Sequence, residues 1–386
     1  MKTVIVIRED DLSGRGKIKM KDVFTLGNLT VEKGKKIQGY LDLPFTDEDK
    51  LPCTLIYGDR EGPTVLVDGG IHNAEYVGIE CVTGLGSMLE PCDIKGILIM
   101  IHLVNVNGFK ARTVSVSAAD GKNLNRCFPG DPDGTYTDQL AYFMEKELFS
   151  RIDYYIDVHN GDWFEDLSPF IYCVGNGDQK TTDASVRMAK AADVPYYVIS
   201  KSKQGGAYNR AGILGIPSVL LERGCYGLWS QEEVAASQKD VRNILREIGA
   251  FESPRFLNDW QKQVPRHMTH AHYVDSKHSG CWFPQKRAGQ VVSPGELIGV
   301  MKDYFGNVIE EVRLNEACII LYQTVSYSVP KDSPLVAYGH YSDCREEPTG
   351  NDHDHHHHDH ETDLEELHEV RGVETVLSVD NMIQRL

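Results

Sequence analysis

His72 and Glu75, which follow a predicted strand, have the side chains and the spacing of a pair of metal ligands. The apolar run Thr64–Asp68 leads into Gly69–Glu75, where paired glycines allow a sharp turn and an imidazole and a carboxylate stand three residues apart. If this turn continues into a helix, the two side chains share one face. One nitrogen and one oxygen ligand make half of a first-row metal site. The pair alone is weak evidence, because such spacings occur by chance in many helices.

A second strand end supplies a third candidate ligand. In Tyr155–Gly161, His159 follows an apolar strand, and Asp157 is placed to orient its imidazole. The alternative is an imidazole that is hydrogen-bonded within a polar loop. We favour the metal site, because His72, Glu75 and His159 are all expected at the carboxyl edge of one sheet. Two histidines and one carboxylate leave a fourth position on Zn²⁺ for water, so the sequence predicts one Zn²⁺ per subunit.

A hydrolytic zinc site also needs a base, and Glu222 is the candidate. It follows the apolar run Ser218–Leu221, so we expect its carboxylate beside both the metal and a partly apolar wall. Such a carboxylate is suited to take a proton from water on the metal and to pass it to a leaving nitrogen. The alternative is a structural ion pair of Glu222 with Arg223 or Arg210.

Two arginines lie between the second and third candidate ligands. Arg112 is part of Lys110–Thr113, and Arg126 follows Asn125 in the Asn-, Gly- and Pro-rich segment Asp120–Gly130. A guanidinium can clamp a carboxylate with two hydrogen bonds or stabilise the oxyanion of a tetrahedral intermediate. We therefore predict that this region faces a substrate. The alternative is a pair of solvated arginines, which is the common state of this residue.

These side chains require a sheet whose strands end at one edge, and the surrounding sequence predicts one. Short β-branched runs alternate with longer amphipathic stretches from about residue 17 to 260, which is typical of an α/β domain with a mostly parallel sheet between helical layers. The predicted strands are Thr64–Asp68, Gly96–Asn105, Tyr154–Val158 and Pro217–Leu221. The predicted helices are Tyr76–Leu89, Asp138–Phe149, Thr182–Ala192 and Gln231–Ile248.

Beyond about residue 264 the pattern changes to short strands, most of them opened by glycine or proline. This is typical of a small all-β barrel or sandwich. The predicted strands are Gly280–Phe283, Gly289–Val292, Gly295–Met301, Cys318–Tyr322 and Pro334–Tyr338. We divide the chain into a catalytic domain over 1–263, a small β domain over 264–342 and an acidic, His-rich tail over 343–386. Within the tail, Thr362–Glu365 has the form of a capping box and predicts a short helix.

The tail contains six histidines within His353–His360. A purification tag is one interpretation, but tags are normally terminal and not interleaved with aspartate. We favour a native tract that binds Zn²⁺ or Ni²⁺ loosely and is separate from the catalytic site. From Asp343 to Glu369, eleven acidic residues face a single arginine, so the tail carries about ten of the seventeen net negative charges.

Composition limits the class of protein. The 386 residues are 41% hydrophobic and 25% charged, which is typical of a globular chain. The net charge of −17 argues against nucleic acid and anionic membranes as partners. No apolar run approaches the roughly 20 residues of a membrane span, and the N-terminus does not resemble a signal peptide, so we expect a cytoplasmic protein. The nine cysteines form no CxxC pair, which gives no sign of a thiolate zinc site or a disulfide framework.

The order of these motifs resembles the succinylglutamate desuccinylase/aspartoacylase family of the zinc carboxypeptidase-like clan. The likeness covers about residues 20–255, and its most specific element is the string NLNRCFPG at Asn123–Gly130. The resemblance implies a mixed sheet flanked by helices, followed by a small C-terminal β domain. It also implies roles for seven residues. These are His72, Glu75 and His159 as zinc ligands, Glu222 as general base, Arg112 as the carbonyl-polarising arginine, and Asn125 and Arg126 as the clamp on a substrate carboxylate.

We therefore predict a zinc-dependent amidohydrolase that cleaves the C–N amide bond of a small N-acylated amino acid or a related amide. One alternative is a zinc carboxypeptidase that acts on peptides. Another is a metal-binding or metal-delivery protein whose working part is the His-rich tail. A non-catalytic descendant is disfavoured, because all seven polar positions are present. The acyl group, the amine and the oligomeric state, including a homo-oligomer, stay open.

Overall fold

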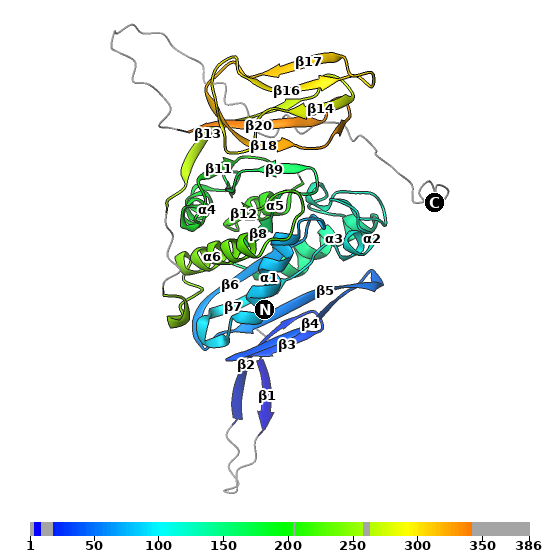
Figure 1. Cartoon of the computed structure of the whole chain (residues 1–386). Helices are drawn as coiled ribbons and strands as arrows, with labels where there is room; N and C mark the ends of the chain where they lie inside the picture. The colour runs from blue at the N-terminus through cyan, green and yellow to red at the C-terminus, as the bar shows by residue number, and fades with distance from the viewer. Residues whose placement is uncertain (1–3, 9–17, 204, 258–262, 342–386) are drawn as a thin grey trace.

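The computed structural model of the chain describes residues 4–8, 18–203, 205–257 and 263–341. A large mixed sheet runs through the molecule with helices packed on it, and further β structure lies at its C-terminal end (Figure 1). The predicted α/β class with a C-terminal β region is confirmed. A separate three-stranded sheet near the N-terminus consists of β1 (Val4–Arg8), β2 (Ile18–Leu26) and β3 (Leu29–Glu32).

The central strands of the large sheet are parallel. Its strands lie in the order β11 (Tyr196–Ser200), β10 (Phe170–Val174), β12 (Ser218–Glu222), β8 (Tyr154–His159), β6 (Arg60–Gly69), β7 (Lys95–Ile101), β5 (Thr46–Tyr57) and β4 (Lys35–Leu43). β12, β8, β6 and β7 run parallel to one another, whereas β10 and β5 flank this block in the opposite direction. The apolar runs of β6 and β7 are buried on both faces of the sheet, as parallel strands between helices require.

Helices cover both faces of this block. One face packs against α1 (Tyr76–Met88), α4 (Gln179–Ala191) and α6 (Gln231–Glu247). The other packs against α2 (Val106–Ala111), α3 (Tyr136–Phe143) and α5 (Ala207–Ile213). Shorter turns lie at Pro91–Asp93, Leu124–Arg126, Met144–Leu148, Phe149–Arg151 and Pro254–Phe256.

The register of the parallel strands brings the candidate ligands to one edge. Gly69 at the end of β6 is paired with Val158 of β8, and His159 is paired with Glu222 of β12. Parallel strands in this register end together, so residues that follow them lie side by side at the carboxyl edge of the sheet. This confirms the placement that the sequence predicts for the strand-end residues.

The large sheet continues into the C-terminal β region. β13 (Arg266–Asp275) runs parallel to β11 and is followed in the sheet by β20 (Pro334–Tyr341), β18 (Cys318–Thr324) and β15 (Val291–Val292); β9 (Glu165–Leu167) also pairs with β18. A second sheet contains β17 (Val308–Arg313), β16 (Leu297–Lys302), β14 (Gly280–Pro284) and β19 (Ser328–Val329). The two sheets enclose a core that includes Trp282, Ile298, Met301, Ile320 and Val336. The domain division at residue 264 stays a prediction, and the helix at Thr362–Glu365 lies outside the described residues.

Several element boundaries differ from the sequence-based expectation. The strand predicted over Gly96–Asn105 ends at Ile101, because Asn105 caps a helix by accepting a hydrogen bond from the backbone N–H of Gly108 at 3.0 Å. The helix predicted over Asp138–Phe149 is α-helical only to Phe143 and continues as a π-helical turn. The sequence pattern predicts no strand at β1–β5, β9–β11, β13, β17 or β19.

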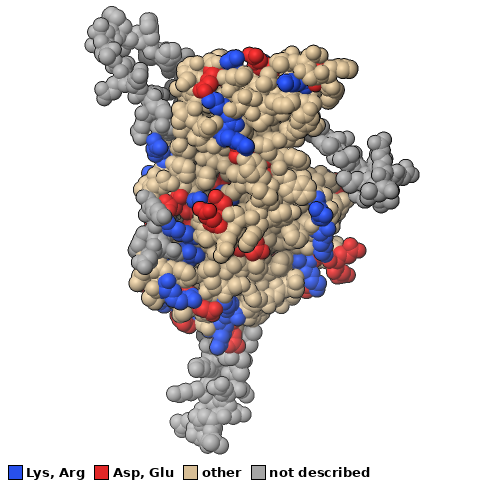
Figure 2. Space-filling view, viewed as in Figure 1, with Lys and Arg blue, Asp and Glu red and all other residues tan. Residues whose placement is uncertain are grey.

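Charges of both signs are interspersed on the face shown in Figure 2, and no patch of one sign extends over it. Most of the net negative charge that the sequence carries belongs to residues 343–386, which lie outside the described part of the chain. Within the described residues, none of the helices has the length and apolar character that a membrane crossing demands.

Candidate metal centre and its pocket

The first two candidate ligands lie in a tight turn between β6 and α1. Gly70 has a φ of 72°, which turns the chain sharply as it leaves the strand. The N–H of Glu75 bonds the carbonyl of His72 at 3.3 Å, and α1 begins at the next residue. The two side chains are therefore brought together by a turn and not by the face of a helix.

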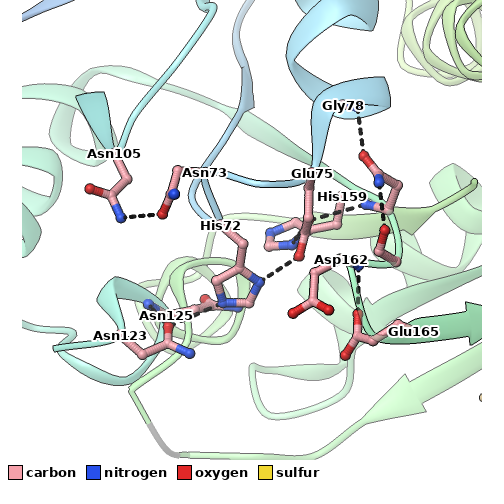
Figure 3. A network of polar contacts seen from close by, with 12 residues as sticks. His72, Asn73, Glu75, Gly78, Asn105, Asn123, Asn125, His159, Asp162 and Glu165 are labelled. Carbon is pink, nitrogen blue, oxygen red and sulfur yellow. Dashed lines mark hydrogen bonds and ion pairs between the residues drawn. The ribbon is translucent and has the colours of Figure 1, made fainter. Parts of the chain in front are cut away.

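Glu75 lies between the imidazoles of His72 and His159 (Figure 3). Its Oε1 is 2.7 Å from Nδ1 of His72, and its Oε2 is 2.8 Å from Nδ1 of His159. One ligand atom from each of the three residues lies within 4.8 Å of the others. Although burial alone would raise it, the two imidazoles lower the pKa of Glu75 to about 2. The structure thus brings the three predicted ligands into a single cluster.

The outer nitrogen of each imidazole has a partner of its own. Nε2 of His72 is 3.1 Å from Oδ1 of Asn123, and Nε2 of His159 is 2.8 Å from Oδ1 of Asp157. Both rings therefore direct Nδ1 toward the cluster and Nε2 away from it. An oxygen beside the second nitrogen is typical of metal-binding histidines; at His159 this contact is an ion pair with Asp157 that lacks hydrogen-bond alignment.

A buried pair of carboxyl groups lies behind His159. Asp157 is paired with Asp68 on β6, and the hydroxyl of Tyr155 donates to both Asp68 oxygens at 3.0 and 3.1 Å. Burial and the neighbouring Asp157 raise the pKa of Asp68 well above its usual range. Burial alone would lower the pKa of His159, but Asp157 and Glu75 raise it well above the usual range. The site is therefore a buried set of ionisable groups that shift one another's pKa.

Hydrogen bonds from the side chain of Asn105 and the backbone of Asn160 hold the turn that carries the first two ligands. Nδ2 of Asn105 donates to Oδ1 of Asn73 at 3.0 Å, and the N–H of Asn160 donates to Oε2 of Glu75 at 3.1 Å. The N–H of Gly78 in turn donates to Oδ1 of Asn160 at 3.1 Å. Figure 3 shows these contacts on both sides of the cluster. The ligand positions are fixed by several segments at once.

Glu222 lies at the end of β12 beside His159, and its Oε2 is buried without a hydrogen-bond partner among the described residues. Burial and the charge of Glu75 raise its pKa to about 8. The alternative ion pairs do not form: Arg223 pairs with Asp240 at 2.9 Å and Arg210 pairs with Glu145 at 2.6 Å. The carboxylate of Glu222 is left to face the pocket.

The pocket over this cluster has a volume of about 230 Å³. Residues of the α/β region and residues of the C-terminal β region both line the pocket, so neither region forms it alone. The lining residues from the α/β region include His72, Glu75, His159, Glu222, Asn125, Arg126, Tyr172 and Tyr208. The lining residues from the C-terminal β region are Tyr273, Tyr322 and Pro334.

The three remaining predicted residues have different positions. Arg126 lines the pocket, and its guanidinium donates to the carbonyl of Asn125 at 2.8 Å; no acidic side chain among the described residues pairs with it. Asn125 also lines the pocket, and its Oδ1 accepts the N–H of Ala207 at 2.8 Å. Arg112 is exposed, has a φ of 59° and is not a lining residue. The structure therefore places Arg126 and Asn125 in the wall of the pocket, but not Arg112.

Glu165 is a pocket residue that sequence reasoning missed. It opens β9, lines the pocket and accepts the N–H of Asp162 at 2.9 Å (Figure 3). Burial, Asp162 and Glu75 raise its pKa well above the usual range. The acidic stretch after His159 was the available signal, but which carboxylate turns inward depends on the pairing of β9 with β18.

The chain is similar to known proteins over most of its length. Residues 61–248 match the family model described as the succinylglutamate desuccinylase/aspartoacylase catalytic domain. An N-alpha-acetyl-L-2,4-diaminobutyric acid deacetylase from Halomonas elongata is 30% identical over 274 residues, which cover 69% of this chain and 79% of the relative.

Solved structures share the fold over most of the chain. The product-bound ectoine utilization protein EutE (DoeB) from Ruegeria pomeroyi is 25% identical with a TM-score of 0.73, over 83% of this chain and 98% of the other. A succinylglutamate desuccinylase from a Silicibacter species is 23% identical with a TM-score of 0.73 and the same coverage, which is evidence for the fold alone.

Proposed function

The chain belongs to the succinylglutamate desuccinylase/aspartoacylase family, and on this premise we propose that it is a zinc-dependent hydrolase of small N-acylated amino acids. The observation that carries the proposal is the buried oxygen of Glu222, which has no hydrogen-bond partner in the described part of the chain and faces a pocket that also contains a His–Glu–His cluster and Arg126. Each group that amide hydrolysis requires has a counterpart there.

The donor set fits Zn²⁺. Two imidazole nitrogens and one carboxylate are the ligands of many catalytic zinc sites, and His72, Glu75 and His159 offer them within 4.8 Å. The outer partners Asn123 and Asp157 fix the ring orientations that ligation needs. When bound, zinc would supply a Lewis acid that polarises a carbonyl and lowers the pKa of water.

Glu222 acts as general base and then as general acid in this proposal. It removes a proton from the attacking water while the water oxygen bonds to the amide carbon. The same proton then passes to the leaving nitrogen as the C–N bond breaks, which yields a carboxylic acid and a free amine. A pKa of about 8 suits the second transfer near neutral pH, and a cation on the neighbouring ligands would lower that pKa toward the value that the first transfer needs.

Arg126 and Asn125 hold the free carboxylate of the substrate. The guanidinium of Arg126 lies at the pocket and is paired with no carboxylate of the described chain, so it is available for a bidentate contact. Arg112 retains its predicted role as the group that polarises the carbonyl only if its segment moves inward when substrate binds. That movement is a separate proposal, tested by the Arg112→Ala variant below.

Glu165 points to the substrate class. Its carboxyl group shares the pocket wall with Glu75 and Glu222, and burial, Asp162 and Glu75 raise its pKa; a cation bound beside Glu165 is therefore favoured, because it stabilises the ionised form. We infer that the amine half of the substrate carries a second, positively charged nitrogen that meets Glu165. An N-acetylated diamino acid such as N-alpha-acetyl-L-2,4-diaminobutyric acid, the compound in the name of the relative, has both the carboxylate and the ammonium group.

A hydrolysis panel on the zinc-loaded full chain tests the proposal. We expect release of acetate from N-alpha-acetyl-2,4-diaminobutyrate, slower release from N-acetylalanine, and little cleavage of N-succinylglutamate, which brings additional carboxylates. No hydrolysis of any acyl amino acid would contradict the proposal, and preferential cleavage of peptides would favour the carboxypeptidase alternative. The pocket of about 230 Å³ supports the smaller substrate, because pockets for drug-sized ligands are roughly 300–1,000 Å³.

The metal-delivery alternative is tested with a chain that lacks residues 345–386. The proposed enzyme retains its specific activity in this variant, because the proposed ligands, base and substrate contacts all lie between His72 and Glu222. A delivery protein would instead lose its function together with the His-rich tract.

A further inference from the structure

A second His–Glu–His cluster lies in the C-terminal β region. His272 is on β13, His340 is on β20, and Glu316 is in the bend that precedes β18. One ligand atom from each of the three lies within 4.8 Å of the others, as in the first cluster. None of the three lines the pocket over the first cluster. Two imidazoles and a carboxylate are again a donor set that Zn²⁺ prefers.

The sheet brings these residues together from two strands and the bend that precedes a third. In the antiparallel pair of β13 and β20, His272 is opposite Tyr338, and His340 lies two residues further along β20. Residues two apart on a strand point to the same face, so both imidazoles and the Tyr338 ring share that face. β18 pairs with the other side of β20 and brings Glu316 to the end of the same face. Figure 1 shows β13, β20 and β18 as neighbours.

The carboxylate of the cluster is oriented by a hydrogen bond. The hydroxyl of Tyr338 donates to Oε1 of Glu316 at 3.1 Å, and Oε2 of the same carboxylate lies 3.2 Å from Nε2 of His340. The rings of His272 and His340 are 6.3 Å apart at an interplanar angle of 73°. One oxygen of Glu316 is thus held by Tyr338, while the other lies beside Nε2 of His340.

Nε2 of His340 is shielded from solvent and forms no well-aligned hydrogen bond. A buried polar atom without a hydrogen bond is costly, and coordination to a cation removes that cost. The side chains of His340 and Glu316 are 22% and 48% exposed, so a hydrated ion has a path to the cluster. The donor atom is thus buried, and the partly exposed side chains still leave the ion a path to it.

We propose that His272, Glu316 and His340 form a second zinc site, which is separate from catalysis and links β13, β18 and β20. The ion joins strands that are far apart in sequence, so its binding stabilises the folded β region. These strands also carry pocket residues such as Tyr273, but successive residues of a strand point to opposite faces and none of the three ligands lines the pocket, so we expect hydrolysis to be unchanged by occupancy of the second site. This proposal does not depend on the proposed function, since its evidence is a different set of residues.

The test counts zinc ions in a full-length chain whose six tail histidines are replaced by asparagine, so that the tract cannot contribute. The replaced positions are His353, His355, His356, His357, His358 and His360. After equilibration with a micromolar zinc buffer, elemental analysis is expected to find two zinc ions per chain. Co²⁺ in place of zinc is expected to give two sets of visible absorption bands.

Two variants assign the ions. Glu316→Gln replaces a half-exposed carboxylate by a side chain of the same shape, and His340→Ala removes an imidazole. Each is expected to reduce zinc from two ions to one, to abolish one Co²⁺ spectrum and to leave hydrolysis unchanged. His159→Ala is expected to remove the other ion and the activity. His278→Ala, an exposed histidine after β13, is the matched control and is expected to retain two.

One zinc ion per chain in the tail-substituted background would overturn the proposal. So would two ions that persist in both Glu316→Gln and His340→Ala. Unchanged hydrolysis in these variants verifies that they fold, which separates loss of a metal site from loss of structure. A failure of the hydrolase proposal would leave the zinc count at the second cluster unaffected, so the two outcomes are distinguishable.

Discussion

The chain contains two clusters with the same ligand types, and their surroundings differ. In the cluster of His72, Glu75 and His159, the last two side chains are 4% and 2% exposed, and the pocket opens onto it. In the cluster of His272, Glu316 and His340, the last two are 48% and 22% exposed. Only the first cluster has Glu222 and Arg126 in the same pocket.

The difference arises from the two kinds of sheet. Parallel strands end together, so β6, β8 and β12 deliver ligands and a base to one edge that helices and the β region enclose. The antiparallel strands β13 and β20 instead present the second cluster across a sheet face. A His–Glu–His set therefore indicates a metal site, but its position in the fold determines whether a substrate and a base can join it.

The largest expected effect is that of Glu222→Gln. The amide side chain cannot accept a proton, so we expect kcat to fall about 10²–10⁴-fold while zinc at the first cluster is retained. Steady-state kinetics and elemental analysis measure the two quantities. Glu247→Gln, at a glutamate on α6 that faces Arg187 at 3.8 Å, is the control and should be fully active. Substantial turnover in the Glu222 variant would mean that the base is another group.

Removing a side chain that orients a metal ligand should weaken zinc binding more at the first cluster than at the second. Asp157→Asn keeps the size of the side chain but removes the charge 2.8 Å from His159, and we expect about 10–100-fold weaker zinc binding. Tyr338→Phe removes one hydrogen bond of about 0.5–1.5 kcal/mol at the more exposed cluster, so its effect should be about tenfold or less. Competition with a chelator gives both affinities. Equal losses would remove the distinction between the clusters.

Arg126→Ala should mainly weaken substrates with a free carboxylate. Loss of hydrogen bonds to a charged group costs about 1.5–3 kcal/mol, which is roughly a 10–100-fold increase in KM. The matching carboxamide substrate serves as the control and should be affected much less. Arg112→Ala tests the role of the second arginine. A fall in kcat at constant KM would support the inward movement proposed for it, and an unchanged kcat would reject its role.

Glu165→Gln is expected to have the smallest effect on turnover and to alter selectivity. The preference for N-alpha-acetyl-2,4-diaminobutyrate over N-acetylalanine should fall by about tenfold, because a charged hydrogen bond to the second amine is replaced by a neutral one. Ratios of kcat/KM for the two substrates measure this preference. An equal loss for both substrates would show that Glu165 supports the site without recognising the ammonium group.

The sequence was sufficient to predict the site residues that lie at the ends of strands. Apolar runs followed by Gly-Gly or by His-Asn-Gly identify where buried strands leave the sheet, and the carboxyl ends of parallel strands meet. His72, Glu75, His159 and Glu222 were predicted for this reason, and the structure brings them together. The strand order was not predictable from local patterns, because it depends on the pairing of strands that are far apart in the sequence.

The tertiary structure alone determined which other side chains surround these ligands. Glu165 enters the pocket because β9 pairs with β18, more than 150 residues later in the chain, and Tyr273 and Tyr322 close the opposite wall from the β region. Arg112 has the residue type that the motif requires but lies outside the wall. His272 and His340 become neighbours only when β13 and β20 pair. Local patterns determine which segments form strands, but contacts between distant strands depend on the register and packing of the whole sheet.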